Sequence, residues 1–321
     1  MRGAKTMAEG DERMRWIRML GLVLAMLAGN ATMAQPPSSG RLVEMGELPS
    51  ALVGPRAVTL WLPPGYERGR DRYPVIYMHD GQNLFDAKKT NFGVEWGMDE
   101  AMARLASLGI GRAAIIVGIH STALRYREYM PRGVYDRLPP AYAKLVRDSH
   151  DGEPVSDAYL RFIVEELKPR IDRAYRTRPG RADTAIMGSS MGGLISIYAL
   201  GRYPEIFGQA AALSVHWPLV GAQAAGNVPP DAPAIVTTAF AAWLKDSRVD
   251  PRVNRLYIDH GTATIDAFYP PFARAMEGVL ATRGWRTGYA FQSRIFTGTA
   301  HDERAWAERA DIPLAFLLAR P

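Results

Sequence analysis

The sequence feature that most constrains the fold is the turn GSSMG at residues 188–192, with Ser190 at its centre. It fits the pattern G-x-S-x-G. An apolar run at residues 185–187 precedes it, and a helix-forming segment at residues 194–200 follows. A strand that reverses sharply into a helix strains its central residue and leaves room for little beside it, which explains the two glycines. We therefore predict a nucleophile elbow that holds the Ser190 hydroxyl above the end of a sheet, beside the N–H groups of a helix N-terminus.

The first 34 residues are typical of a secretory signal peptide. Arg13, Arg15 and Arg18 precede an apolar run at residues 19–28, and small residues follow as far as Ala34. A charged segment, a short apolar segment and a small-residue cleavage site define such a signal. The apolar run is too short for a comfortable membrane span. We predict cleavage after Ala34 and a secreted or periplasmic protein without stable membrane insertion; an uncleaved N-terminal anchor helix is the alternative.

Composition excludes several other classes of function. The chain has 321 residues, a net charge of +6 and no cysteine. It has no basic run of the kind that nucleic-acid binding requires. Without cysteine there can be no disulfide, no thiol nucleophile and no thiolate metal site. We predict neither a metal nor a cofactor.

Alternating apolar strands and amphipathic helices predict an α/β fold. The strand patterns are nearly all apolar, as expected when helices cover both faces of a parallel sheet. We expect strands at 58–62, 74–79, 113–119, 185–187, 209–214, 255–259 and 288–297, and helices at 98–108, 156–175, 194–200, 267–283 and 303–318. This order predicts a mostly parallel, doubly wound sheet in a single domain at 41–321, after a Pro/Ser/Gly linker at 35–40. Ser156 is the expected N-cap of its helix, and residues 120–152 are expected to form a long polar and aromatic loop.

A serine nucleophile needs a base and a group that orients the base. In α/β hydrolases these residues follow in the order serine, acid, histidine. His260 and His301 lie well beyond Ser190, and His301 is placed between the last strand and the last helix, where this fold puts the base. The acid should follow the strand that ends near Asp259. We favour Asp266 over Asp259 because the loop beyond the strand can carry it toward His301.

The oxyanion of the reaction needs two hydrogen-bond donors. One should be the backbone N–H of Met191, directly after the nucleophile. The other should come from the loop that follows the strand at 74–79, where Gly81 allows the Gln82 N–H to turn inward.

Three segments carry a resemblance to a known family. YMHDGQNLFD at 77–86, GSSMGGL at 188–194 and HDERAW at 301–306 are similar to the Putative esterase family of α/β hydrolases. That family includes esterase D-type enzymes, feruloyl and acetylxylan esterases, enterochelin esterases and mycolyltransferases. The resemblance covers nearly the whole mature chain, but the family's acid turn is matched only loosely by GTATID at 261–266. Because some siderophore-esterase relatives work with a Ser-His pair, the resemblance leaves the acid open.

Aromatic and basic residues near the predicted sheet edge are possible substrate contacts. Trp96, His216 and Trp217 should end near this edge; they could stack on a sugar or a phenolic ring, or simply pack in the core. Arginines of the 120–152 segment could meet an anionic substrate, although a solvated basic loop is favoured for Arg125, Arg127 and Arg132.

The sequence as a whole predicts a secreted serine esterase acting on acyl esters of carbohydrates or phenolic acids. A siderophore esterase is the runner-up. A binding protein that keeps the hydrolase scaffold without catalysis is the alternative from another class, and acyl transfer in place of hydrolysis stays open.

Overall fold

The computed structural model describes residues 40–90 and 92–319, which belong to one compact unit. The predicted signal peptide at 1–34, and all but the last residue of the predicted linker at 35–40, lie outside the described residues.

An eight-stranded sheet runs through the described part of the chain, in the order β1-β2-β4-β3-β5-β6-β7-β8. Strands β3 to β8 pair with one another in parallel, whereas β2 pairs antiparallel with both β4 and the edge strand β1. The predicted parallel α/β arrangement is therefore confirmed. The strands are β1 (Arg41–Leu48), β2 (Arg56–Leu62), β3 (Val75–His79), β4 (Ile115–Ile119), β5 (Thr184–Ser189), β6 (Gln209–Leu213), β7 (Arg255–Gly261) and β8 (Phe291–Phe296).

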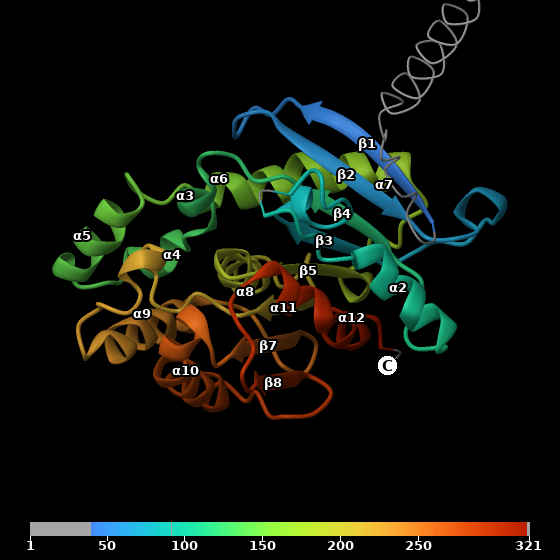
Figure 1. Cartoon of the computed structure of the whole chain (residues 1–321). Helices are drawn as coiled ribbons and strands as arrows, with labels where there is room; N and C mark the ends of the chain where they lie inside the picture. The colour runs from blue at the N-terminus through green and yellow to red at the C-terminus, as the bar shows by residue number, and fades with distance from the viewer. Residues whose placement is uncertain (1–39, 91, 320–321) are drawn as a thin grey trace, which may run out of the picture. The chain divides into compact units, whose positions relative to one another are not determined.

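Helices cover both faces of this sheet. They are α2 (Met98–Ser107), α3 (Arg125–Tyr129), α4 (Arg132–Tyr135), α5 (Pro140–Ser149), α6 (Ser156–Arg161), α7 (Lys168–Ala174), α8 (Met191–Arg202), α9 (Ala232–Asp246), α10 (Pro270–Thr282), α11 (Glu303–Glu308) and α12 (Asp311–Leu318). Figure 1 shows α2 beside α12 at the right of the molecule, and α9 beside α10 to the left of β7 and β8.

Strand alternation divides the core into two layers. In β5, Ile186 packs into one apolar cluster, and its neighbours Ala185 and Met187 pack into the other. The first cluster holds α6 to α10, and the second holds α2, α11 and α12. Successive side chains of a strand point to opposite faces, so a strand covered on both sides must be apolar at every position. This explains why the central strands are visible as unbroken apolar runs in the sequence.

Strand β1 was not predicted from the sequence. Its residues are mostly half-buried or exposed, and its pairing with β2 shifts register between Glu44 and Glu47, around Gly46 with φ of 68°. A bulge of this kind disrupts the two-residue alternation by which a strand is recognised.

The segment 120–152 is helical, so the predicted long loop is wrong. Helices α3, α4 and α5 occupy it, and Figure 1 shows them grouped together at the left of the molecule. They bury Tyr129, Val134 and Tyr142 in the larger core cluster. Each helix is only four to ten residues long, too short for the helical period to stand out among so many polar residues.

The helix expected at 156–175 forms, but with an interruption. A π-helical segment, Phe162–Leu167, joins α6 to α7 just before Pro169, where the missing N–H and the ring of proline disturb regular α-helical bonding. Ser156 does not cap this helix, because the preceding residue Val155 is the N-cap. Its hydroxyl instead accepts a hydrogen bond from the Arg132 N–H at 2.9 Å.

Candidate active site

Ser190 lies at the tip of a strained turn between β5 and α8. Its φ of 56° and ψ of −121° are unusual for a residue with a side chain. A Cβ at Gly188 would lie 2.7 Å from the backbone carbonyl of Gly192, so the close approach of the two backbones excludes a larger residue there. The Ser190 N–H donates to the Leu213 carbonyl at 2.8 Å. This is the elbow geometry expected from the sequence.

His301 connects the serine to a carboxylate. It follows β8, and its backbone N–H donates to Thr264 Oγ1 at 2.8 Å. The ring Nε2 lies 2.9 Å from Ser190 Oγ, and Nδ1 lies 2.6 Å from Asp266 Oδ1. An ionised carboxylate only accepts hydrogen bonds, so Nδ1 carries the proton and Nε2 is left to accept the serine proton.

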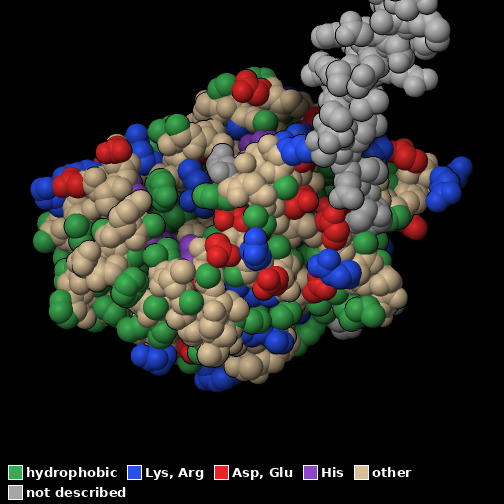
Figure 2. All heavy atoms as spheres, in the orientation of Figure 1, with side chains coloured by type: hydrophobic (Ala, Val, Ile, Leu, Met, Phe, Trp, Pro, Cys, Tyr) green, Lys and Arg blue, Asp and Glu red, His purple; other side chains and the backbone are tan. Residues whose placement is uncertain are grey.

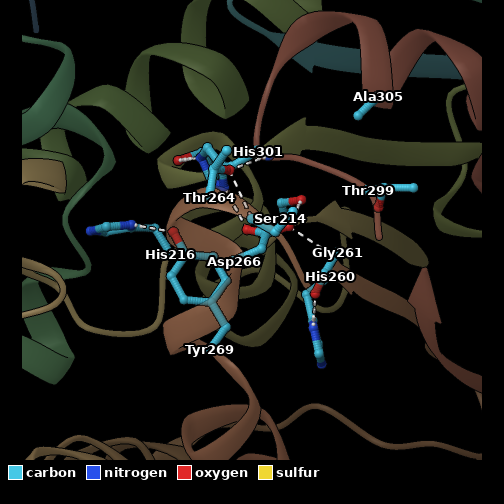
Figure 3. Close-up of polar contacts among 12 residues, drawn as sticks. Ser214, His216, His260, Gly261, Thr264, Asp266, Tyr269, Thr299, His301 and Ala305 are labelled. Atoms are coloured by element: carbon cyan, nitrogen blue, oxygen red, sulfur yellow. Dashed lines mark hydrogen bonds and ion pairs between the residues drawn. The ribbon is translucent and has the colours of Figure 1, made fainter. Parts of the chain in front are cut away.

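Asp266 is fully buried and held from three sides. Besides His301, its second oxygen Oδ2 accepts from the Gly261 N–H at 2.6 Å and from Ser214 Oγ at 2.7 Å. Figure 3 shows Asp266 between His301 and these two donors. Burial alone would raise its pKa, but hydrogen bonds from His301, Ser214 and Gly261 and the charge of His301 outweigh burial and lower the pKa below its usual value. The carboxylate is therefore ionised at neutral pH.

Asp259, the other acid weighed from the sequence, has different partners. It lies inside β7, where it accepts from Arg309 Nη2 at 3.1 Å, from the Ser214 N–H at 2.9 Å and from the Tyr257 hydroxyl at 2.9 Å. Burial raises its pKa despite the neighbouring arginine. The structure thus brings Asp266, and not Asp259, to His301.

Ser214 links the two carboxylates and was not singled out from the sequence. Its hydroxyl donates to Asp266 and accepts from Trp306 Nε1 at 3.0 Å and Arg309 Nη2 at 2.8 Å. With φ of 43°, it directly follows β6, at the same edge of the sheet as Ser190. A polar residue at the carboxyl end of a buried strand was the available signal.

Of the two predicted oxyanion donors, one directly follows Ser190 in the chain, and the other belongs to a residue that lines the same cavity as Ser190. Met191 is the first residue of α8, so its N–H is among those left without a partner inside the helix. Gln82 lies in the short 3-10 turn Gly81–Asn83 and lines the same cavity as Ser190. A Cβ at Gly81 would lie 2.4 Å from the Gly118 carbonyl carbon, so only glycine permits this turn to pack against β4.

An ion pair with Arg125 holds Asp80, the residue that precedes the turn Gly81–Asn83. Asp80, with φ of 56°, accepts two hydrogen bonds from Arg125, from Nε at 2.7 Å and from Nη2 at 2.8 Å. Burial is outweighed by this arginine, which lowers the pKa of Asp80. Arg125 is therefore not a residue of a solvated loop. In contrast, Arg127 donates to the Glu153 carbonyl, and Arg132 pairs with exposed carboxylates.

A cavity of about 520 Å³ opens at Ser190 and His301. Trp96, one of the predicted substrate contacts, lines it; its ring is 1% exposed and packs edge-on against Trp306. The other lining residues are Asp80, Gln82, Asn83, Phe92, Ser121, Thr122, Ala123, Arg125, Tyr126, Ser189, Ala222, Ile265, Asp302, Glu303 and Trp306.

His216 and Trp217, the other two predicted contacts, are not among the residues that line this cavity. His216 is 2% exposed, with its ring nitrogens 2.6 Å from the Tyr269 hydroxyl and the Val220 carbonyl oxygen (Figure 3). Burial lowers its pKa to about 3, so it is neutral. Trp217 packs edge-on against Phe240 in the core. Both His216 and Trp217 are therefore buried packing residues, and the structure does not place them as substrate contacts.

The described residues contain neither a metal-binding cluster nor a membrane-spanning helix. No group of three or more His, Asp or Glu side chains in residues 40–90 and 92–319 could hold a metal ion. Over the same ranges, no helix has both the length and the apolar character needed to cross a membrane. A larger cavity of about 800 Å³, lined by residues of α2, β8 and α12, contains none of Ser190, His301 and Asp266.

Comparison with known proteins places this geometry in a family. Residues 50–308 match the family model described as Putative esterase. The chain belongs to this esterase family. Two curated relatives from Bacillus subtilis (strain 168) are an uncharacterized protein, YbbA, at 26% identity over 170 residues, and the ferri-bacillibactin esterase BesA, at 28% over 147 residues. The matches cover 53% and 45% of this chain, and 60% and 49% of the relatives, so the chain spans less than two thirds of either.

Solved structures show the same fold. A ferulic acid esterase superposes with a TM-score of 0.57 at 20% identity, covering 87% of this chain and 98% of its own. The ferric enterobactin esterase from Salmonella typhimurium gives a TM-score of 0.62 at 16% identity, covering 89% of this chain and 60% of its own. The predicted family and the predicted α/β-hydrolase fold are thereby confirmed. Family and fold together support a carboxylic ester hydrolase.

Proposed function

We propose that this protein is a serine esterase that hydrolyses carboxylic esters through Ser190, His301 and Asp266. The observation that carries the proposal is the continuous hydrogen-bonded chain from Ser190 Oγ through His301 to Asp266, with 2.9 and 2.6 Å steps. Membership of the esterase family supports the same reaction class.

The reaction follows from the roles of these groups. Ser190 Oγ attacks the ester carbonyl carbon while His301 Nε2 takes the hydroxyl proton, and Asp266 stabilises the imidazolium that forms. The Met191 and Gln82 N–H groups bind the oxyanion of the tetrahedral intermediate. Collapse of this intermediate releases the alcohol, which takes the proton from His301. A water molecule then attacks the acyl-enzyme by the same steps and frees the acid and Ser190.

The proposed substrates are acyl esters of carbohydrates or phenolic acids. Support comes from the aromatic side chains Phe92, Trp96, Tyr126 and Trp306 in the cavity, which suit the flat face of a sugar or a phenolic ring. A siderophore ester is the second candidate, because Arg125 lines the same cavity and one of the curated relatives is a ferri-bacillibactin esterase. We further propose that the protein works outside the cytoplasm, on the basis of the signal-peptide pattern in residues 13–34.

The test combines labelling with kinetics. The protein without residues 1–34 should react with a fluorophosphonate probe at Ser190 and hydrolyse part of a panel of acetyl, feruloyl and catecholate esters. Ser190→Ala and His301→Ala should each lower kcat by about 10⁴–10⁶, and the double variant should be scarcely worse, because the residues act as a unit.

Ser189→Ala is the matched control, since this buried neighbour should not affect labelling. Loss of labelling in Ser189→Ala but not in Ser190→Ala would place the nucleophile one residue earlier. A wild-type protein that neither reacts with the probe nor hydrolyses any ester would favour a binding protein on this scaffold.

A further inference from the structure

A carboxyl group without a stabilising partner faces the cavity beside the triad. Glu303 is the first residue of α11, two positions after His301, and it lines the cavity that holds Ser190. The residue is 9% exposed. Among the described residues, its carboxylate forms no ion pair, and no side chain donates a hydrogen bond to it. Charged side chains are rarely buried to this extent unless they are paired.

The surroundings of Glu303 add negative charge. Burial raises its pKa, and the nearby carboxylates of Asp80 and Asp302 raise it further. Arg125 is the nearby cation that lowers the pKa of Glu303, but its Nε and Nη2 groups both donate to Asp80. The charges of Arg125 and Asp80 therefore largely cancel. Figure 2 shows acidic side chains gathered over α11 and α2, with basic ones among them. The charged residues that line the cavity are three carboxylates, Asp80, Asp302 and Glu303, and one arginine, Arg125, and this excess of negative charge disfavours an anion.

A second acceptor in the cavity also lacks a partner. Asn83 is 5% exposed, and its side-chain oxygen Oδ1 is buried without a hydrogen-bond partner among the described residues. It lines the same cavity as Glu303. A buried acceptor left unpaired is costly, so the chain itself does not satisfy all the polar groups of the residues around this cavity.

We propose that Glu303 is a specificity-determining residue, whose carboxylate accepts a hydrogen bond from a hydroxyl group of a neutral substrate and disfavours anionic esters. This inference rests on the proposed esterase function. It narrows the two substrate classes above: a neutral hydroxylated ester provides a hydrogen-bond donor for Glu303, whereas a substrate with several negative charges meets an uncompensated carboxylate. The hydroxyl belongs either to a phenolic acyl group or to a sugar alcohol, and the test separates these sources.

The experiment compares wild type with Glu303→Gln on matched esters at pH 7.5. Methyl 3,4-dihydroxycinnamate against methyl cinnamate tests hydroxyls on the acyl side. 6-O-Acetylglucose against ethyl acetate tests hydroxyls on the alcohol side. Methyl 4-carboxycinnamate supplies the anion. Glu308→Gln, an exposed residue at the other end of the same helix, is the control variant.

Glu303→Gln should lower kcat/KM about ten-fold for the hydroxylated ester of at least one pair, mainly through KM, because the hydrogen bond to a charged acceptor is replaced by a weaker one to a neutral amide oxygen. The unhydroxylated partner should stay within about two-fold, and the anionic ester should improve several-fold. The affected pair identifies the source of the hydroxyl. Glu308→Gln should change none of these values.

Two failures are distinguishable. If wild type hydrolyses these esters and reacts with a fluorophosphonate, but Glu303→Gln leaves every ratio unchanged, the role of Glu303 is refuted and the esterase function stands. A uniform loss of kcat on all esters would equally refute it, since that result indicates a structural role. If wild type shows neither hydrolysis nor labelling, the esterase function falls, and the assignment of Glu303 falls with it.

Discussion

Replacing Asp266 by asparagine tests the assignment of the acid most directly. The Gly261 N–H and the Ser214 hydroxyl both donate to Oδ2 of Asp266, so the amide oxygen of an asparagine should take that position. Its NH₂ group would then face His301 Nδ1. Because an amide nitrogen donates, Nδ1 must become the acceptor, and the ring proton moves to Nε2, where it blocks acceptance of the Ser190 proton.

The expected loss can be estimated. A wrong tautomer in a triad of this kind lowers kcat by about 10⁴, which corresponds to roughly 5 kcal/mol of transition-state stabilisation. The fold should survive, since asparagine has nearly the same shape and keeps the acceptor for both donors. The assay is kcat on the best ester of the panel, together with the melting temperature.

Asp259→Asn is the matched control. It removes the charge opposite Arg309, which is only 4% exposed; leaving a buried charge unpaired costs about 3–5 kcal/mol. For a chain of this size that is a fall in Tm of roughly 5–15 °C, with kcat changed by less than about ten-fold. A large loss of kcat in Asp259→Asn with full activity in Asp266→Asn would refute the reasoning. Full activity in both variants would indicate a Ser-His dyad.

Two further predictions concern the whole protein. Burial lowers the pKa values of His79 and His216 to about 3. Below pH 6.5 the unfolded chain therefore binds protons that the folded chain does not, and the free energy of unfolding should fall by up to about 4 kcal/mol between pH 7 and pH 5. The His216→Phe variant should show a weaker pH dependence. Urea denaturation at both pH values measures this, and equal stability would contradict it. The exported protein should begin near Gln35; N-terminal sequencing that found residues 1–34 still attached would refute the signal peptide.

Local patterns were sufficient to predict the fold class and to propose Ser190 as the nucleophile. The elbow is encoded within five residues, because the close approach of the Gly188 and Gly192 backbones and the strain at Ser190 are effects of neighbouring positions. The central strands are buried on both faces, so their apolar character is written in consecutive residues. His301 was identifiable because chain order in this fold places the base after the last strand.

Tertiary structure was needed wherever a partner lies far away in the chain. The sequence favoured Asp266 over Asp259 only narrowly. What separates the two in the structure is that Arg309, from the end of the chain, pairs with Asp259, and His301 pairs with Asp266. The role of Arg125 was misjudged for the same reason, since its carboxylate partner precedes it by 45 residues. Periodicity and motif spacing report on neighbours along the chain, whereas charge compensation, burial and an unpaired carboxylate such as Glu303 depend on which distant segments the fold brings together.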